Sequence, residues 1–308
     1  MTVDAVAAWL LEGDPSIRWQ VRRDLLDEPE RKWSAERALV GTEGWGARLL
    51  AERRADGRWT KGLYTPKWTS TTYTLMLLRR LGLPRDHKAA VDSVRMLLDK
   101  QVWVFGSPKK PYWEACVAGM ALSLAGAFDV DASPREALLA AVLEAQMPDG
   151  GWNCRRPRGA VHSSFHTTMN VLEGLREYAV AGGPRRKEVE RAEGRAHEFL
   201  CAHRLYCSHR TGQVVDARMT RLTLPIGWRH DVLRGLDHFQ SARAPRDERL
   251  ADPIGVVRSK CLADGRWPSQ GRQAGHVWFE LERAGQPSRW NTLRALRVLR
   301  WWDGKRGR

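Results

Sequence analysis

Two apolar runs of this chain begin with side chains that commonly bind metal ions. The run PYWEACVAGMAL places Glu114 and Cys116 two residues apart, and HSSFHTTMN places His162 and His166 one helical turn apart. A carboxylate, a thiolate and an imidazole offered by neighbouring helices, with a fourth position left for a substrate, form the open tetrahedral site of a catalytic zinc. The sequence therefore predicts zinc held by Glu114, Cys116 and His166, with His162 at the edge of a substrate pocket.

Each of these residues also has a purely structural interpretation. Cys116 could be a small core residue, Glu114 a carboxylate at a helix start and His166 a capping or core imidazole. Both interpretations stay open. A second Cys/His group lies at residues 201–209, but its spacing matches no usual zinc pattern and is better explained as a helix end.

A further pair of polar residues begins the run WRHDVLRGLDHF. His230 and Asp231 lie one predicted helix beyond His166, where either could act as a general base or orient a metal ligand. We predict them as catalytic residues. The alternative is an ordinary polar first turn.

Fifteen tryptophans are far more than a chain of 308 residues usually carries. Those in the Gly-containing turns, Trp59, Trp152 and Trp267, are interpreted as anchors of these turns. Four others lie near the starts of predicted helices and could either ring a substrate pocket or pack the core. These four are Trp68, Trp113, Trp228 and Trp290.

Helices are needed to position these side chains. Apolar residues recur at intervals of three and four in six segments, which predicts helices over residues 14–26, 69–81, 112–128, 164–178, 227–240 and 288–302. Prolines lie in short connectors before new helical runs, whereas the opposite connections are long and rich in Gly, Trp and Arg. We therefore expect a closed ring of inner and outer helices. The long loops should cover the end of the ring where the inner helices begin, which we call the mouth. Helix N-termini attract anions and loops often carry functional residues, so we expect the functional site at this mouth.

The connection QMPDGGW at residues 146–152 carries a family resemblance. Looser copies, DGRW, occur at residues 56–59 and 264–267. The pattern Gln-x3-Gly-x-Trp is the core of the QW motif of terpenoid cyclases. These enzymes have an α/α toroid fold, which they share with the β subunits of protein prenyltransferases. The chain resembles this superfamily, which implies an all-α fold in which residues 1–308 form one toroid of about six helical hairpins.

The resemblance also implies chemistry. In protein prenyltransferases an Asp-x-Cys at one helix start and a His at the next bind zinc, and Glu114, Cys116 and His166 would stand for them here. Glu replaces Asp, and neither the DxDD acid of protonating cyclases nor a DDxxD magnesium motif is present. The predicted function is a zinc-dependent enzyme, of the transferase or cyclase kind, that activates a nucleophile toward an apolar, isoprenoid-like substrate.

Charge supports a second hypothesis. The chain has 51 Lys and Arg against 36 Asp and Glu, a net charge of +15, which suits polyanions but could also only keep outer helix faces soluble. The opening DPSIRWQVRRDLL is similar to units of HEAT-type arrays, so the alternative function is a non-catalytic helical-repeat protein that binds nucleic acid.

No run is long enough for a membrane span, and five scattered cysteines argue against a disulfide framework. We therefore predict a cytoplasmic protein.

Overall fold

Helices account for nearly all regular structure in residues 3–304, the part of the chain that this computed structural model describes. The predicted all-α class is confirmed. The two antiparallel strand pairs are short, β1 (Val104–Ser107) with β2 (Lys110–Trp113) and β3 (Trp267–Pro268) with β4 (Pro287–Ser288). The α-helices are α1 (Val3–Leu11), α2 (Pro15–Asp24), α3 (Glu30–Ala38), α4 (Gly44–Ala51), α5 (Thr71–Leu81), α6 (Lys88–Asp99), α7 (Ala115–Ala127), α8 (Ala132–Glu144), α9 (Phe165–Val180), α10 (Arg186–Ala202), α11 (Val232–Ser241), α12 (Ala251–Ser259) and α13 (Arg289–Asp303).

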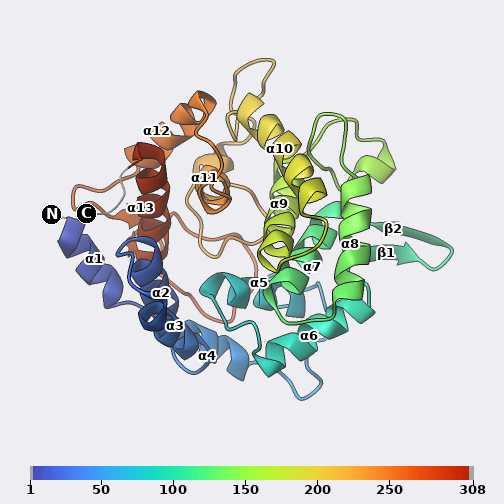
Figure 1. The fold of residues 1–308 in the computed structure, drawn as a ribbon, viewed down its shortest axis with the longest axis horizontal. Helices are drawn as coiled ribbons and strands as arrows, with labels where there is room; N and C mark the ends of the chain where they lie inside the picture. Colours follow the sequence, from blue (N-terminus) through green and yellow to red (C-terminus); the bar gives the residue numbers. More distant parts are fainter. Residues whose placement is uncertain (1–2, 305–308) are drawn as a thin grey trace.

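The helices follow one another around a central axis, and successive helices alternate between positions nearer to and farther from it (Figure 1). Helices α5, α7, α9 and α11 lie nearer the centre, and α6, α8, α10 and α12 lie outside them. The last helix, α13, packs beside α2: Arg297 forms an ion pair with Asp24 at 3.2 Å, and Arg300 donates to the Asp24 carbonyl at 2.7 Å. These contacts join the two ends of the helical series.

Two of the expected inner helices begin later than the periodicity predicted. The helix expected over residues 112–128 begins at Ala115, because Lys110–Trp113 pairs with β1 in a hairpin. The helix expected over residues 227–240 begins at Val232, and the side chain of Asp231 caps it. Apolar periodicity continued through both preceding segments, so it could not mark these starts.

The Gly-Trp turns repeat one set of hydrogen bonds, which confirms the tryptophans as turn anchors. Two residues before each Trp a glycine adopts a positive φ, at 81°, 97° and 78°. Each indole N–H donates to the carbonyl ten residues earlier in the outer helix, and each Trp backbone N–H donates to a threonine hydroxyl in the next inner helix. The sets are Trp59 with Leu49 and Thr71, Trp152 with Val142 and Thr168, and Trp267 with Val257 and Thr292.

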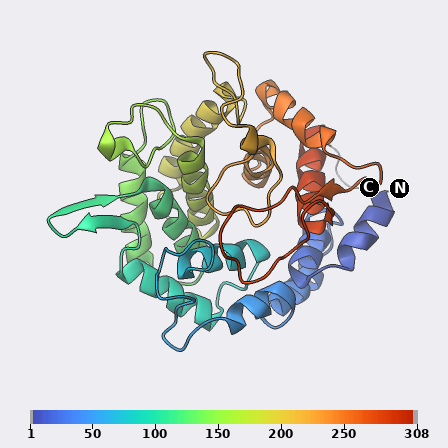
Figure 2. The same cartoon turned by 180° about the vertical axis from the view of Figure 1, so that it is seen from behind.

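The two ends of the ring differ. Long loops cross the centre of the ring at one end (Figure 2) and are tied together by backbone hydrogen bonds, including Trp68 N–H to His276 O and Leu224 N–H to Gly271 O. A cavity of about 960 Å³ is lined mostly by the middle and C-terminal parts of helices and by the turns that follow them, and it also reaches Trp290 at the start of α13 and Ile226 in the loop before α11. The sequence placed the site at the loop-covered mouth, whereas most of the residues that line this cavity lie toward the other end.

Candidate metal centre

Glu114 and Cys116 lie at the N-terminal end of α7. Glu114 is the N-cap residue, but its carboxylate makes no capping hydrogen bond, so it is available as a ligand. Its backbone N–H donates to the Trp103 carbonyl at 3.0 Å, which ties the helix start to the residue before the β1–β2 hairpin. Both side chains are half-buried. The sequence prediction that these two residues share a site is consistent with this geometry.

The third member of the group is Cys154, which follows the Trp152 turn anchor by two residues. Its sulfur accepts a hydrogen bond from the Cys116 backbone N–H at 3.1 Å and one from the Thr167 hydroxyl, on α9, at 3.5 Å. Helices α7 and α9 approach closely here, since a Cβ on Gly119 would lie 2.7 Å from the Asn170 carbonyl. This packing holds the loop cysteine against the start of α7.

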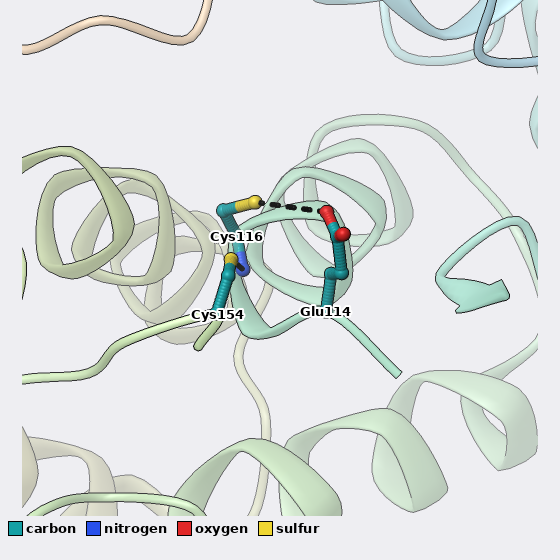
Figure 3. Close-up of side chains that lie close together, drawn as sticks. All are labelled: Glu114, Cys116 and Cys154. Atoms are coloured by element: carbon teal, nitrogen blue, oxygen red, sulfur yellow. Dashed lines mark hydrogen bonds between the residues drawn. The ribbon is translucent and has the colours of Figure 1, made fainter. Parts of the chain in front are cut away.

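The three side chains offer ligand atoms that all lie within 4.8 Å of one another (Figure 3). Cys116 Sγ and Glu114 Oε2 are 3.9 Å apart. Zinc bonds of about 2.0–2.3 Å in a tetrahedron separate ligand atoms by about 3.3–3.8 Å, so small side-chain rotations would bring this group to ligand spacing. Within residues 3–304 this is the one group of three or more His, Cys, Asp or Glu side chains with such spacing.

The electrostatics of the group favour a bound cation. The Cys154 hydrogen bond, burial and the neighbouring charges of Cys154 and Glu114 raise the pKa of Cys116 well above its usual value. The pKa of Cys154 is lowered, chiefly because the Cys116 and Thr167 side chains and the Cys116 N–H stabilise its thiolate. Without a cation, three negative charges cannot coexist at this spacing, so one thiol keeps its proton. A divalent ion would remove that constraint.

The aromatic side chain of Tyr64 lies near this site. Burial and the charges of Cys116 and Glu114 raise the pKa of Tyr64, whose ring lies 5.7 Å from that of Phe105. The Lys67 ammonium lies 5.5 Å from the Tyr64 ring, and its charge partly opposes the rise in the pKa of Cys116. The site therefore has one cation, Lys67, and one aromatic ring, Tyr64, in its neighbourhood.

His166 lies outside this group. Its Nδ1 accepts a hydrogen bond from the His230 backbone N–H at 2.9 Å, and its ring meets the Trp228 ring edge-on at 5.1 Å. Burial and the charges of Arg234 and Arg229 lower its pKa to about 4. Successive helix residues point about 100° apart, so Thr167 faces Cys154 while His166 faces the segment before α11. The expected third ligand is replaced by a loop cysteine.

His230 and Asp231 are both buried at the start of α11. His230 Nε2 lies 2.7 Å from the Leu205 carbonyl, and burial lowers the pKa of this imidazole to about 3. The Asp231 carboxylate accepts the Arg234 backbone N–H at 2.8 Å, and burial raises its pKa. Neither belongs to the group of Glu114, Cys116 and Cys154; Asp231 caps α11, and the His230 ring contacts the Leu205 carbonyl. The catalytic role predicted for them stays a prediction.

The predicted pocket residues do not form one site. His162 is exposed, and the half-buried Trp113 packs against the core at the end of β2. Trp68 lies edge-on to Tyr73, at 4.9 Å, within the loop-covered mouth. Trp228 faces His166 in the same region, whereas Trp290 lines the large cavity. The five residues lie in loops, in β2 and in α13, and helix periodicity does not reveal how these segments are arranged in space.

The Cys/His group at residues 201–209 does not form a cluster of three ligands. Cys201 and Cys207 are buried, and His203 Nε2 lies 2.8 Å from His209 Nδ1. The interpretation of this segment as a helix end agrees with α10, which ends at Ala202.

Cys154 is the residue that the sequence analysis missed as a ligand. The signal that could have identified it is its place two residues after the turn-anchor Trp152, since that anchor fixes the loop against the start of α9.

No protein-family model matches this chain, and a search of curated proteins found no significant match. None of the described helices is both long enough and apolar enough to span a bilayer.

Proposed function

We propose that this protein is a zinc-dependent enzyme in which Glu114, Cys116 and Cys154 hold the ion and leave one coordination position for a substrate nucleophile. The observation that carries the proposal is the convergence of three ligand atoms from two separate segments within 4.8 Å. Three protein ligands plus an open fourth position is the arrangement of catalytic zinc sites, whereas structural sites use four.

The ligand set favours a particular chemistry. Two thiolates and a carboxylate around Zn²⁺ leave the site with a net charge of −1. The ion lowers the pKa of a coordinated thiol or water, so the bound nucleophile loses its proton to solvent near neutral pH. Because the site is already negative, a bound substrate thiolate stays electron-rich and reactive. We therefore propose a thiol as the nucleophile that is activated.

The second substrate is proposed to be apolar, as the resemblance to prenyltransferases implies. Tyr64 lies near the ligand group and its ring contacts that of Phe105, so these two rings could hold such a chain. Lys67 lies near enough to attract a negatively charged leaving group. This part of the proposal depends on the resemblance in residues 146–152 as well as on these side chains.

Elemental analysis of protein purified without chelator tests the metal site. We expect about one zinc per chain, and Cys116→Ala and Cys154→Ala should each remove most of it, because three ligands leave no redundancy. Replacement by Co²⁺ should give absorption bands of a thiolate-ligated ion, and an added small thiol should shift them if a coordination position is open.

Cys261→Ala is the matched control, because Cys261 is exposed and lies outside the group. It should retain full zinc, and so should His166→Ala. A protein that takes up no metal in zinc-supplemented medium, or whose zinc survives Cys154→Ala, would refute the site. Cobalt bands that no added thiol shifts would refute thiol activation.

A further inference from the structure

The cavity of about 960 Å³ at the other end of the ring has an unusual charge. Twelve arginines and five carboxylates line it, an excess of seven positive charges. None of Glu114, Cys116 and Cys154 is among the lining residues. Its volume falls in the range of small-molecule sites.

The carboxylates do not balance these arginines. Glu173 alone pairs with Arg79, Arg80 and Arg234, at 2.6 to 2.9 Å. Burial and the neighbouring positive charges lower the pKa of Arg80 to about 9, despite the opposing effect of Glu173. The single carboxylate of Glu173 therefore does not offset the burial of Arg80 and the charges of Arg234 and Arg79 beside it. An anion in the cavity would supply further negative charge.

Some arginines here have a structural explanation. Cations near the C-terminal ends of helices offset the helix dipole and bind free carbonyls. Arg37 does this by donating to the Gly82 and Leu83 carbonyls, and Arg300 donates to the Asp24 carbonyl. Such contacts use the donors of the side chain. They do not account for an arginine whose donors remain unused.

Arg294 is such a residue. It is 1% exposed, its Nε binds Asp237 at 3.1 Å, and its Nη1 and Nη2 have no hydrogen-bond partner. Four residues earlier on the same face of α13, Trp290 is 3% exposed and its indole N–H is also without a partner. Both side chains line the cavity. Buried donors left unpaired are costly, and here they belong to two side chains of one helix that line the same cavity.

We propose that this cavity binds a small molecule through a phosphate or diphosphate group, with Arg294 and Trp290 as its donors. The guanidinium fork matches phosphate oxygens, and the excess positive charge favours a multiply charged anion. Trp19 and Phe128 also line the cavity and offer apolar surface to the organic part of the ligand. This site is independent of the proposed zinc centre.

Calorimetric titration of the full chain with inorganic pyrophosphate, and separately with inorganic phosphate, tests the proposal at constant ionic strength with chloride as the reference anion. We expect one pyrophosphate per chain, bound more tightly than phosphate. Arg294→Gln should weaken pyrophosphate about tenfold or more, because it removes a charged donor pair. Trp290→Phe retains an aromatic ring but removes the indole N–H, so it should weaken pyrophosphate binding a few-fold.

Arg186→Gln is the matched control for charge, because Arg186 is exposed on the outer helix α10. It should leave pyrophosphate affinity unchanged, and Cys154→Ala should do the same while losing zinc. Trp290→Phe keeps the test decisive if Arg294→Gln fails to fold. Absence of pyrophosphate binding, equal affinities in Arg294→Gln and Arg186→Gln, or tight binding of a single-stranded oligonucleotide that Arg294→Gln does not affect would each overturn the proposal.

Discussion

The two ends of this ring of helices present opposite electrostatic problems. At the loop-covered end, Glu114, Cys116 and Cys154 bring acidic ligands together with little positive charge beside them. At the cavity end, arginines outnumber carboxylates by more than two to one. A bound cation would therefore balance the acidic side chains at the loop-covered end, and a bound anion would balance the arginines at the cavity end. The comparison shows why a net charge of +15 is a poor guide to function, since it hides one region that is locally acidic and another that is locally basic.

The largest effect should come from removing the carboxylate that holds the arginine end together. Glu173→Gln leaves three buried guanidiniums without their shared partner, so we expect the free energy of unfolding to fall by about 3–5 kcal/mol. Glu177→Gln is the matched control, because Glu177 pairs only with Arg79 and is more exposed, and it should cost about 1 kcal/mol. Denaturant unfolding measures both, and equal losses would contradict the network.

The same carboxylate gives this end a pH dependence. Burial alone would raise the pKa of Glu173, but Arg234, Arg80 and Arg79 hold it well below its usual value. Because the pKa is depressed in the folded state, the stabilisation is complete above the unfolded-state pKa of about 4.3 and is lost as pH falls through the folded-state pKa. The wild-type protein should thus lose stability below about pH 4 more steeply than Glu173→Gln.

A smaller effect should distinguish the Trp152 turn, beside the proposed metal site, from the equivalent Trp267 turn elsewhere in the ring. Trp152→Phe and Trp267→Phe each remove an indole hydrogen bond in a buried turn, so each should cost about 2 kcal/mol of stability. Only Trp152→Phe should also weaken zinc binding, because Trp152 anchors the loop that carries Cys154. Thermal melting and zinc titration provide the two readouts. Equal zinc affinity in the two variants would show that the anchor does not position Cys154.

The smallest expected effect is the pH dependence of zinc affinity. The pKa of Cys116 is raised by its hydrogen bond with Cys154 and by burial, so Cys116 holds a proton near neutral pH and must release it to bind the ion. Zinc affinity should therefore rise by about tenfold per pH unit for each proton released, and fall correspondingly toward acid. Competition with a chromophoric chelator between pH 6 and 8 measures this slope, and a flat profile would mean that both thiols are already ionised.

Local sequence patterns determined much of the architecture. The recurrence of apolar residues at intervals of three and four predicted six of the helices, and the Gly-x-Trp turns predicted a recurring anchor that the structure confirms at Trp59, Trp152 and Trp267. These features depend on residues close in the chain, whose geometry follows from backbone sterics and helix period. Glu114 and Cys116 were identified for the same reason, since they lie two residues apart at one helix start.

Only the tertiary structure decided which distant groups meet. Cys154 rather than His166 joins Glu114 and Cys116, because the close packing of α7 against α9 and the Trp152 anchor set the direction in which the loop approaches. The arginines of the cavity are spread along the chain and gather only when the inner helices form a ring. The composition shows that these arginines are present. Only the folded structure shows that Arg294 Nη1 and Nη2 are buried away from water without a hydrogen-bond partner, in a cavity where carboxylates are fewer than arginines.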